Sequence, residues 1–214
     1  MWKKHLLNQL LWTTYINLKK RRPTAYRAPS WSWASVIGKI MFRDILEAEK
    51  QDKIARVDDV RVYTVEGKDG QVTGGYLKIH GKILTATWRI CGVKENDVSD
   101  SKEDKEANSW DEAWAANPSK TFCFDMGAGL HTLFEYPDVE KEGFQGGETV
   151  CLAIQKREKP KKCESDGNWS LVLEGLVLMR HGSETFRRIG FFNAPGDGAR
   201  DFLERSKEAV VEIV

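Results

Sequence analysis

Residues 170–180 read SLVLEGLVLMR, with apolar residues on both sides of Gly175. A strand that is apolar on both faces is typical of the centre of a sheet, where neighbouring elements cover both sides. The segments around it alternate polar and apolar residues with a period of two, as strands with one buried face do. We therefore predict strands over residues 53–65, 75–91, 120–126, 148–157, 170–180 and 185–193. Gly81 interrupts the second of these and marks a position where that strand is expected to bend or bulge.

These predicted strands follow one another with little helix between them, which argues against a parallel βαβ architecture. We predict a single β-rich domain over residues 1–214, an antiparallel β-barrel or curved sandwich with flanking N- and C-terminal helices. Leucines at helical spacing predict the first helix, residues 3–18. Asp197 is a suitable N-cap for the closing helix, residues 199–210, in which Val210 belongs to the apolar face. Residues 94–119 are polar and acidic and are expected to form a long insertion.

The charge balance bears on the kind of partner. The chain has 33 Lys and Arg against 32 Asp and Glu, which leaves a net charge of +1. A dedicated nucleic-acid binder needs a clear excess of positive charge, so we expect no nucleic-acid partner. The apolar stretch at residues 6–12 is too short to span a membrane, and no integral membrane segment is expected.

The cysteines and histidines bear on compartment and cofactors. Cys91, Cys123, Cys151 and Cys163 form no CxxC pair, and the first three have apolar, strand-like flanks, which predicts buried thiols in a reducing, cytoplasmic compartment. The four histidines are dispersed, without HxxxH or HExxH spacing, so no metal site is predicted. The glycine-rich stretches lack the sequence context of phosphate-binding loops, and no cofactor is expected.

The most distinctive local pattern is a pair of tryptophans. Trp31 and Trp33 lie two residues apart and alternate with small residues, which predicts a strand with both indoles on one face. We expect this face to belong to the packed core, so that Trp33→Ala costs about 3–5 kcal/mol. The alternative is that the two indoles wall an apolar ligand cavity.

The surrounding stretch resembles a known protein family. Leu11 and Trp12, followed by residues 22–36 (RPTAYRAPSWSWASV), are similar to the signature found downstream of the HET domain in fungal heterokaryon-incompatibility proteins. Further matches follow in the same order at residues 150–154 (VCLAI), 174–178 (EGLVL) and 186–192 (FRRIGFF). The resemblance therefore covers most of the chain. It implies a partner-binding or accessory module without assigned catalytic residues.

The HET domain itself is held to trigger cell death and precedes the signature in the family. Met1 lies only a short predicted helix before the signature, so we expect the chain to lack that domain and its activity. Two hypotheses follow. The first is a HET-derived β module that binds a protein partner or a small apolar molecule. The second is a cofactor-free cyclase or isomerase that folds a terpenoid or polyketide in fungal secondary metabolism.

Both hypotheses place the ligand near the tryptophan signature. Tyr26 and Arg27 lead into it, and Arg27 is suited to stack on an indole or pair with a carboxylate. His131 belongs to the densest group of acid–base side chains. The predicted ligand-binding residues are Tyr26, Arg27, Trp31, Trp33, Trp88 and His131. Catalytic residues and oligomeric state are not predicted.

Overall fold

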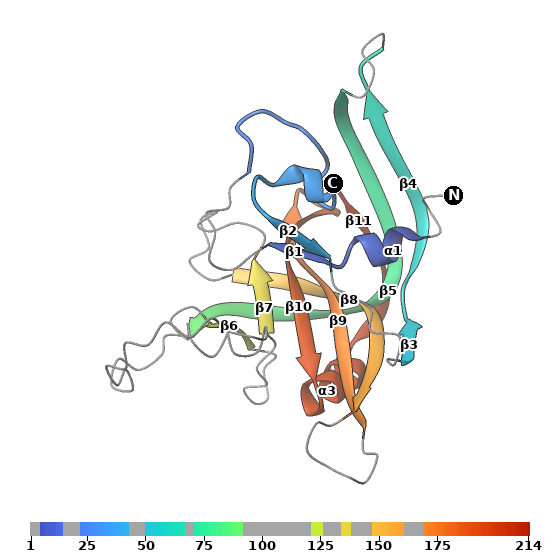
Figure 1. Cartoon of the computed structure of the whole chain (residues 1–214), viewed down its shortest axis with the longest axis vertical. Helices are drawn as coiled ribbons and strands as arrows, with labels where there is room; N and C mark the ends of the chain where they lie inside the picture. Colours follow the sequence, from blue (N-terminus) through green and yellow to red (C-terminus); the bar gives the residue numbers. More distant parts are fainter. Residues whose placement is uncertain are drawn as a thin grey trace.

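The computed structural model describes residues 5–14, 22–42, 50–66, 71–91, 121–125, 134–137, 147–160 and 169–214. A nine-stranded sheet dominates these residues (Figure 1). Its main path runs through β3 (Lys50–Lys53), β8 (Gly147–Pro160), β9 (Trp169–His181), β10 (Thr185–Pro195), β11 (Lys207–Ile213), β5 (Val72–Cys91) and β4 (Arg56–Thr64). Off this path, β6 (Thr121–Asp125) pairs with β5, and β7 (Phe134–Pro137) pairs with β10. The other elements are α1 (Leu6–Gln9), β1 (Trp12–Thr14), the 3₁₀ turn η2 (Trp33–Ser35), β2 (Ile40–Phe42) and α3 (Asp197–Arg205).

The strand pairing returns on itself. Because β5 pairs with β8 as well as with β11, the strands β5, β8, β9, β10 and β11 form a ring. Its pairs are antiparallel except β10–β11, which is parallel over two residue pairs, Thr185 with Glu212 and Phe186 with Ile213. This confirms the predicted fold class, a mainly β and antiparallel barrel or curved sandwich with helices near both ends. The parallel closure was not predicted, and α3 supplies the crossover that it needs.

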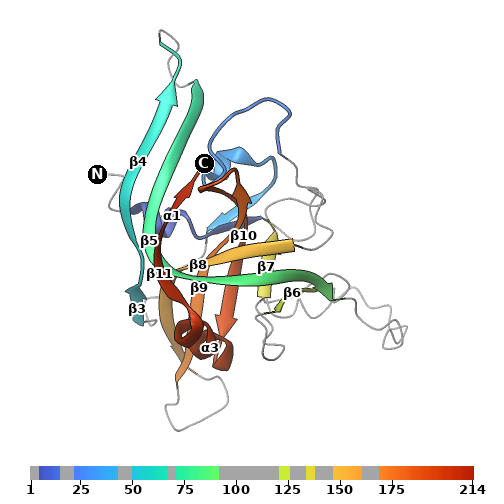
Figure 2. The same cartoon turned by 180° about the vertical axis from the view of Figure 1, so that it is seen from behind.

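The long strand β5 changes partners at its middle glycine. Its first half pairs with β4 as far as His80, and its second half pairs with β8 from Ile83 onward. Gly81 lies at this change of partners, and Figure 2 shows that β5 bends between its upright part, beside β4, and the part that crosses beside β8. A Cβ at Gly81 would lie 3.1 Å from the side chains of Ala55 and Leu152. The predicted bend at this glycine is therefore present, without a register shift in the β5–β11 pairing.

Strand β9 is central, as its apolar sequence predicted. It pairs with β8 on one edge and β10 on the other, and residues 172–178 are all buried. Gly175 allows β8 and β10 to approach, because a Cβ there would lie 2.1 Å from the carbonyl oxygen of Leu152 and 2.6 Å from Cε1 of Phe192. Contacts of this length do not occur without movement of the backbone.

Each face of the sheet carries its own apolar cluster. One face shares its cluster with α1, through residues that include Leu6, Leu77 and Phe191. The other face packs against α3, where the rings of Phe192 and Phe202 stack with centroids 5.5 Å apart. Cys151 belongs to this second cluster as a fully buried thiol, which confirms the prediction for that cysteine. The side chains of Cys91 and Cys123, and all of Cys163, lie outside the described residues.

The predictions for the N-terminal region were partly wrong. The helix predicted over residues 3–18 is the single turn α1, and the chain continues as β1, which pairs with β2. β-Branched Thr13 and Thr14 favour a strand at this point, and Thr14 is buried in it. The strand predicted for residues 31–36 is instead the turn η2, because the Ser32 side chain accepts a hydrogen bond from the amide of Ala34 and caps it.

The C-terminal prediction, a helix over residues 199–210, was also wrong in its extent. The helix α3 begins at Asp197 and ends at Arg205, its N-cap is Gly196 rather than Asp197, and the chain then forms β11. Val210 faces solvent on this strand, whereas Val211 and Ile213 are buried. The predicted acidic insertion, residues 94–119, lies outside the described residues. None of the described helices has the length and apolarity that a membrane crossing requires.

We predict that Gly175→Ala lowers the free energy of unfolding by about 3 kcal/mol, because a methyl group there forces β8 away from β9. Gly74→Ala is the matched control, since its Cβ would meet only the ring edge of Tyr63 at 3.2 Å. That variant should change stability by less than about 1 kcal/mol. Urea denaturation of both variants checks this, and equal losses would contradict the described approach of the strands.

Candidate functional site

The segment at residues 22–36, which carries the tryptophan signature, is fastened across the ends of β10 and β11 by a serine. The Ser30 amide donates a hydrogen bond of 3.2 Å to the carbonyl oxygen of Val214, and its hydroxyl donates to the same oxygen. The Ser30 hydroxyl oxygen also accepts a bond of 3.0 Å from the amide of Arg188. Ser30 therefore joins the signature segment to both strands of the parallel closure.

A buried arginine joins the same place to the N-terminal segment. Arg188 has no exposed surface, and its guanidinium donates to the carbonyl oxygen of Leu10 and, over 2.6 Å, to that of Trp12. It also lies 3.6 Å from the centre of the Trp12 ring, which gives a cation–π contact. Leu10 is the C-cap of α1, so Arg188 satisfies a carbonyl at the end of that helix.

The two signature tryptophans have different environments. Trp31 is 7% exposed and belongs to the core cluster on the α1 face, and its carbonyl oxygen accepts a bond of 3.2 Å from the Trp12 indole. Trp33 is 52% exposed and lies in η2. The prediction that both indoles share one face, and that Trp33 is core, was therefore wrong. The turn rotates Trp33 away from the core that holds Trp31.

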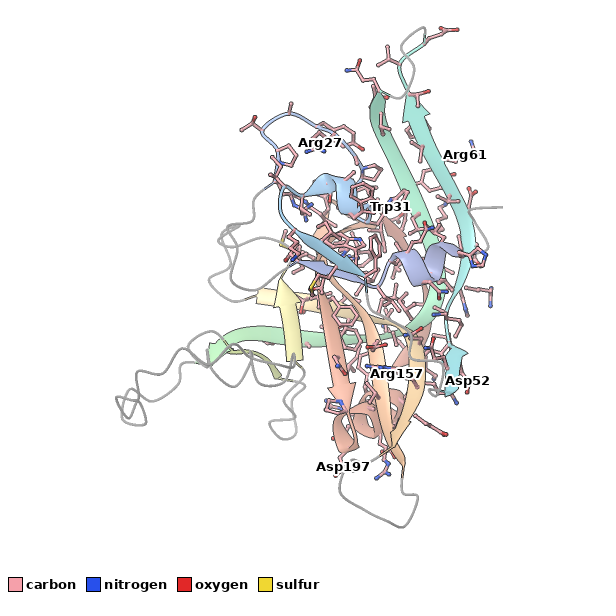
Figure 3. All side chains as sticks on the ribbon, in the orientation of Figure 1. Arg27, Trp31, Asp52, Arg61, Arg157 and Asp197 are labelled. Atoms are coloured by element: carbon pink, nitrogen blue, oxygen red, sulfur yellow. The ribbon has the colours of Figure 1, made fainter. Side chains whose placement is uncertain are left out.

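Beside this network lies a cleft of about 390 Å³, which we call the arginine cleft. Its walls come from the signature segment, the start of β5, the end of β9, the start of β10 and the residue that follows β11. The lining residues are Arg22, Pro23, Ala25, Tyr26, Arg27, Ala28, Ser30, Ser35, Gly74, Gly75, His181, Arg187 and Val214. The loop that carries Arg27 lies at the end of the molecule opposite Asp197 of α3 (Figure 3).

The lining is cationic. It contains Arg22, Arg27 and Arg187, and none of the thirteen lining residues is an Asp or Glu. Arg22 is anchored, because it donates 2.9 Å to the Ser35 hydroxyl and 2.8 Å to the carbonyl oxygen of Arg188. Such a grouping of like charges favours an anionic ligand.

The signature segment also gives the arginine cleft a neutral polar and apolar surface. Tyr26 is 54% exposed, yet burial of the rest of the ring raises the pKa of its hydroxyl above the usual value. The phenol is therefore a neutral hydrogen-bond donor at physiological pH. Pro23, Ala25 and Ala28 provide small apolar surface beside it.

Of the predicted ligand-binding residues, the cleft brings together Tyr26 and Arg27. Trp31 and Trp33 are not in its lining, so neither walls this cleft. The side chain of Trp88 and the whole of His131 lie outside the described residues. The sequence interpretation missed Arg22, Arg187 and His181.

One signal for Arg187 was present in the sequence. Arg187 and Arg188 are adjacent in an apolar strand, so they must point to opposite faces. One of them enters the core and the other reaches the cleft.

A second polar cluster lies within the sheet rather than in a cleft. Arg157 and Glu174, both buried, form an ion pair at 3.0 Å, and the Gln155 amide donates 2.6 Å to the same carboxylate. Lys53 donates to Gln155, and burial lowers the pKa of its ammonium while the Glu174 charge acts in the opposite sense. These groups are engaged with one another, which indicates a structural role. Among the residues that the structure describes, no group of three metal-ligating side chains was found.

We predict that Trp31→Ala lowers the free energy of unfolding by about 3–5 kcal/mol, because it empties a core position. Trp33→Ala should cost less than about 1 kcal/mol, since half of its side chain already contacts water. Thermal and urea unfolding of the two variants, measured side by side, gives the comparison. Equal destabilisation would show that Trp33 is packed after all.

Replacing Arg188 should destabilise the fold through its carbonyl partners. In Arg188→Met, the carbonyls of Leu10 and Trp12 lose these donors inside the core. We expect a loss of about 2–6 kcal/mol, taking ~1–3 kcal/mol for each carbonyl. Arg180→Met, at an exposed arginine on the neighbouring strand, is the control and should lose less than about 1 kcal/mol. Urea denaturation measures both, and a stable Arg188→Met would mean that the N-terminal segment docks without this charge.

Comparison with known proteins does not identify a function for this cleft. No family profile, curated protein or solved structure matches the chain. The resemblance to the HET proteins therefore stays a prediction, and the function has to be argued from the arginine cleft itself.

Proposed function

We propose that the chain is a non-enzymatic binding module, of the kind that the HET resemblance implies, and that it binds an anionic small molecule in the arginine cleft. The observation that carries the proposal is the convergence of Arg22, Arg27 and Arg187 on one cleft whose lining contains no Asp or Glu side chain. In a chain whose net charge is +1, this local excess of positive charge is a specific feature and does not follow from composition.

Holding like charges together opposes folding unless other contacts offset the repulsion. Arg22 is held by the hydroxyl of Ser35 and a backbone carbonyl, which are neutral acceptors. Arg27 is exposed and makes no hydrogen bond or ion pair with the described residues. An anion in the cleft would relieve the repulsion and gain charge-assisted hydrogen bonds from guanidinium groups. The cleft is therefore better suited to a bound anion than to remaining filled with water alone.

The hydroxyl groups of the cleft favour binding over covalent chemistry. The Ser30 hydroxyl is engaged with Val214 and Arg188, and the Ser35 hydroxyl donates to the carbonyl of Ser30 over 3.2 Å. A nucleophile instead needs a base within hydrogen-bond reach of its proton. The cyclase hypothesis gains no support from the lining, in which Tyr26 is the aromatic residue. For such a module we propose a reducing intracellular location, consistent with the buried Cys151 thiol.

Calorimetric titration of the full chain with benzoate, phenyl sulfate and benzylamine tests the proposal. We expect the two anions to bind and the cation benzylamine not to bind. Arg27→Gln should weaken anion binding roughly 10- to 100-fold, as expected for loss of a charged hydrogen-bond donor.

Arg200→Gln is the matched control. It removes the same charge from α3, where Arg200 pairs with Asp197 at the opposite end of the molecule. It should leave anion affinity within about twofold, since distant exposed charges are screened by salt. Equal effects of Arg27→Gln and Arg200→Gln, or no binding of any anion, would refute the assignment of the cleft.

A further inference from the structure

We propose that the anion bound in the arginine cleft is the phosphate of an organic phosphomonoester, an inference that rests on the proposed function. The first argument is charge. A phosphomonoester carries nearly two negative charges at neutral pH and presents three acceptor oxygens. A carboxylate or a sulfate ester carries one. Three arginines in a lining without Asp or Glu side chains are better neutralised by the dianion.

The second argument is that the arginines have different roles in the cleft. Arg22 already donates to Ser35 and to the backbone of Arg188, so its position is fixed and it supplies mainly a local positive field. Arg187 lies half-buried on β10, next to Arg188, whose amide is tied to Ser30. Arg187 is therefore carried by an anchored stretch of strand. A planar guanidinium in this setting suits two-pronged contact with phosphate oxygens.

Arg27 is the third arginine of the cleft. It is exposed on the signature segment, and it has no polar partner among the described residues. A bound phosphate would give this side chain a strong acceptor. Arg27 and Arg187 come from separate parts of the chain, so a ligand with several acceptor oxygens can bridge them, whereas a carboxylate has only two.

The third argument is size. The cleft encloses about 390 Å³. One water takes up roughly 30 Å³ in the liquid, and small-molecule sites span roughly 300–1,000 Å³. The cleft therefore has room for an organic group attached to the phosphate. Tyr26, Pro23 and Ala25, which lie on the signature segment, offer this group an aromatic ring and small apolar surface.

The test is isothermal titration calorimetry of the full chain, at constant pH and ionic strength, with phenyl phosphate, phenyl sulfate and inorganic phosphate. Phenyl sulfate has the same organic group as phenyl phosphate but one charge. We expect phenyl phosphate to bind at least about tenfold more tightly than phenyl sulfate, because it gains an additional charged contact. It should also bind about tenfold more tightly than inorganic phosphate, which lacks the ring.

Four variants test which residues contact the phosphate and which contact the ring of the ligand. Arg27→Gln and Arg187→Gln should each remove the advantage of phenyl phosphate over phenyl sulfate, and Arg200→Gln should preserve it. Tyr26→Leu should weaken phenyl phosphate and leave inorganic phosphate unchanged. Arg27 and Tyr26 are exposed, so their variants are expected to fold normally, and thermal melts verify this.

The outcomes separate this inference from the proposed function. If phenyl sulfate binds as tightly as phenyl phosphate, and Arg27→Gln weakens both equally, the anion site stands and the phosphate assignment is wrong. If neither aromatic anion binds, or if Arg27→Gln and Arg187→Gln change nothing, both the inference and the proposed function are wrong.

Discussion

The stacking of the Arg188 guanidinium on the ring of Trp12 is the contact that holds the N-terminal segment, α1 and β1, on the sheet. It places a positive charge in the core, with backbone carbonyls and an aromatic face as partners. Burying a charge in this way is costly unless each donor finds an acceptor, so the arrangement tolerates little variation in geometry. It therefore fixes where β1 and the end of α1 sit on the sheet. Through the Trp12 indole it also fixes the carbonyl of Trp31, next to Ser30.

The strands were predictable where their side chains alternate between a buried and an exposed face over many residues. β5 satisfies this condition. β8 and β9 are buried on both faces over residues 149–155 and 172–178, and the apolar flanks of Gly175 identified β9 as the central strand. β11 carried the same signal, since Ala209, Val211 and Ile213 face the core. It was assigned to a helix because Val210 was grouped with the apolar residues of α3, although Val210 faces solvent.

The short alternation around Trp31 and Trp33 was misleading for a different reason. Three residues at a period of two are equally compatible with a turn, and a serine at the N-cap position decides between the two. Ser32 holds such a turn, which separates the two indoles.

The arginine cleft could be predicted only in part. Tyr26 and Arg27 were identified because they belong to a distinctive local sequence, but Arg187 and His181 join them only through the ring of strands. Which of two adjacent arginines enters the core depends on the register of β10. That register shifts between Arg188 and Gly190, and no local sequence feature marks such a shift.

The position of β11 in the ring has a consequence for how the chain folds. Leu77 of β5 and Ile213 of β11 are direct partners although they lie far apart in the sequence. Contacts of such high sequence separation slow folding, because a long loop has to close before they form. During synthesis, β5, β8, β9 and β10 leave the ribosome before β11. One edge of β5 therefore stays unpaired until β11 has been made. The chain is therefore expected to depend on chaperones or rapid completion of synthesis to avoid pairing that exposed edge with another molecule.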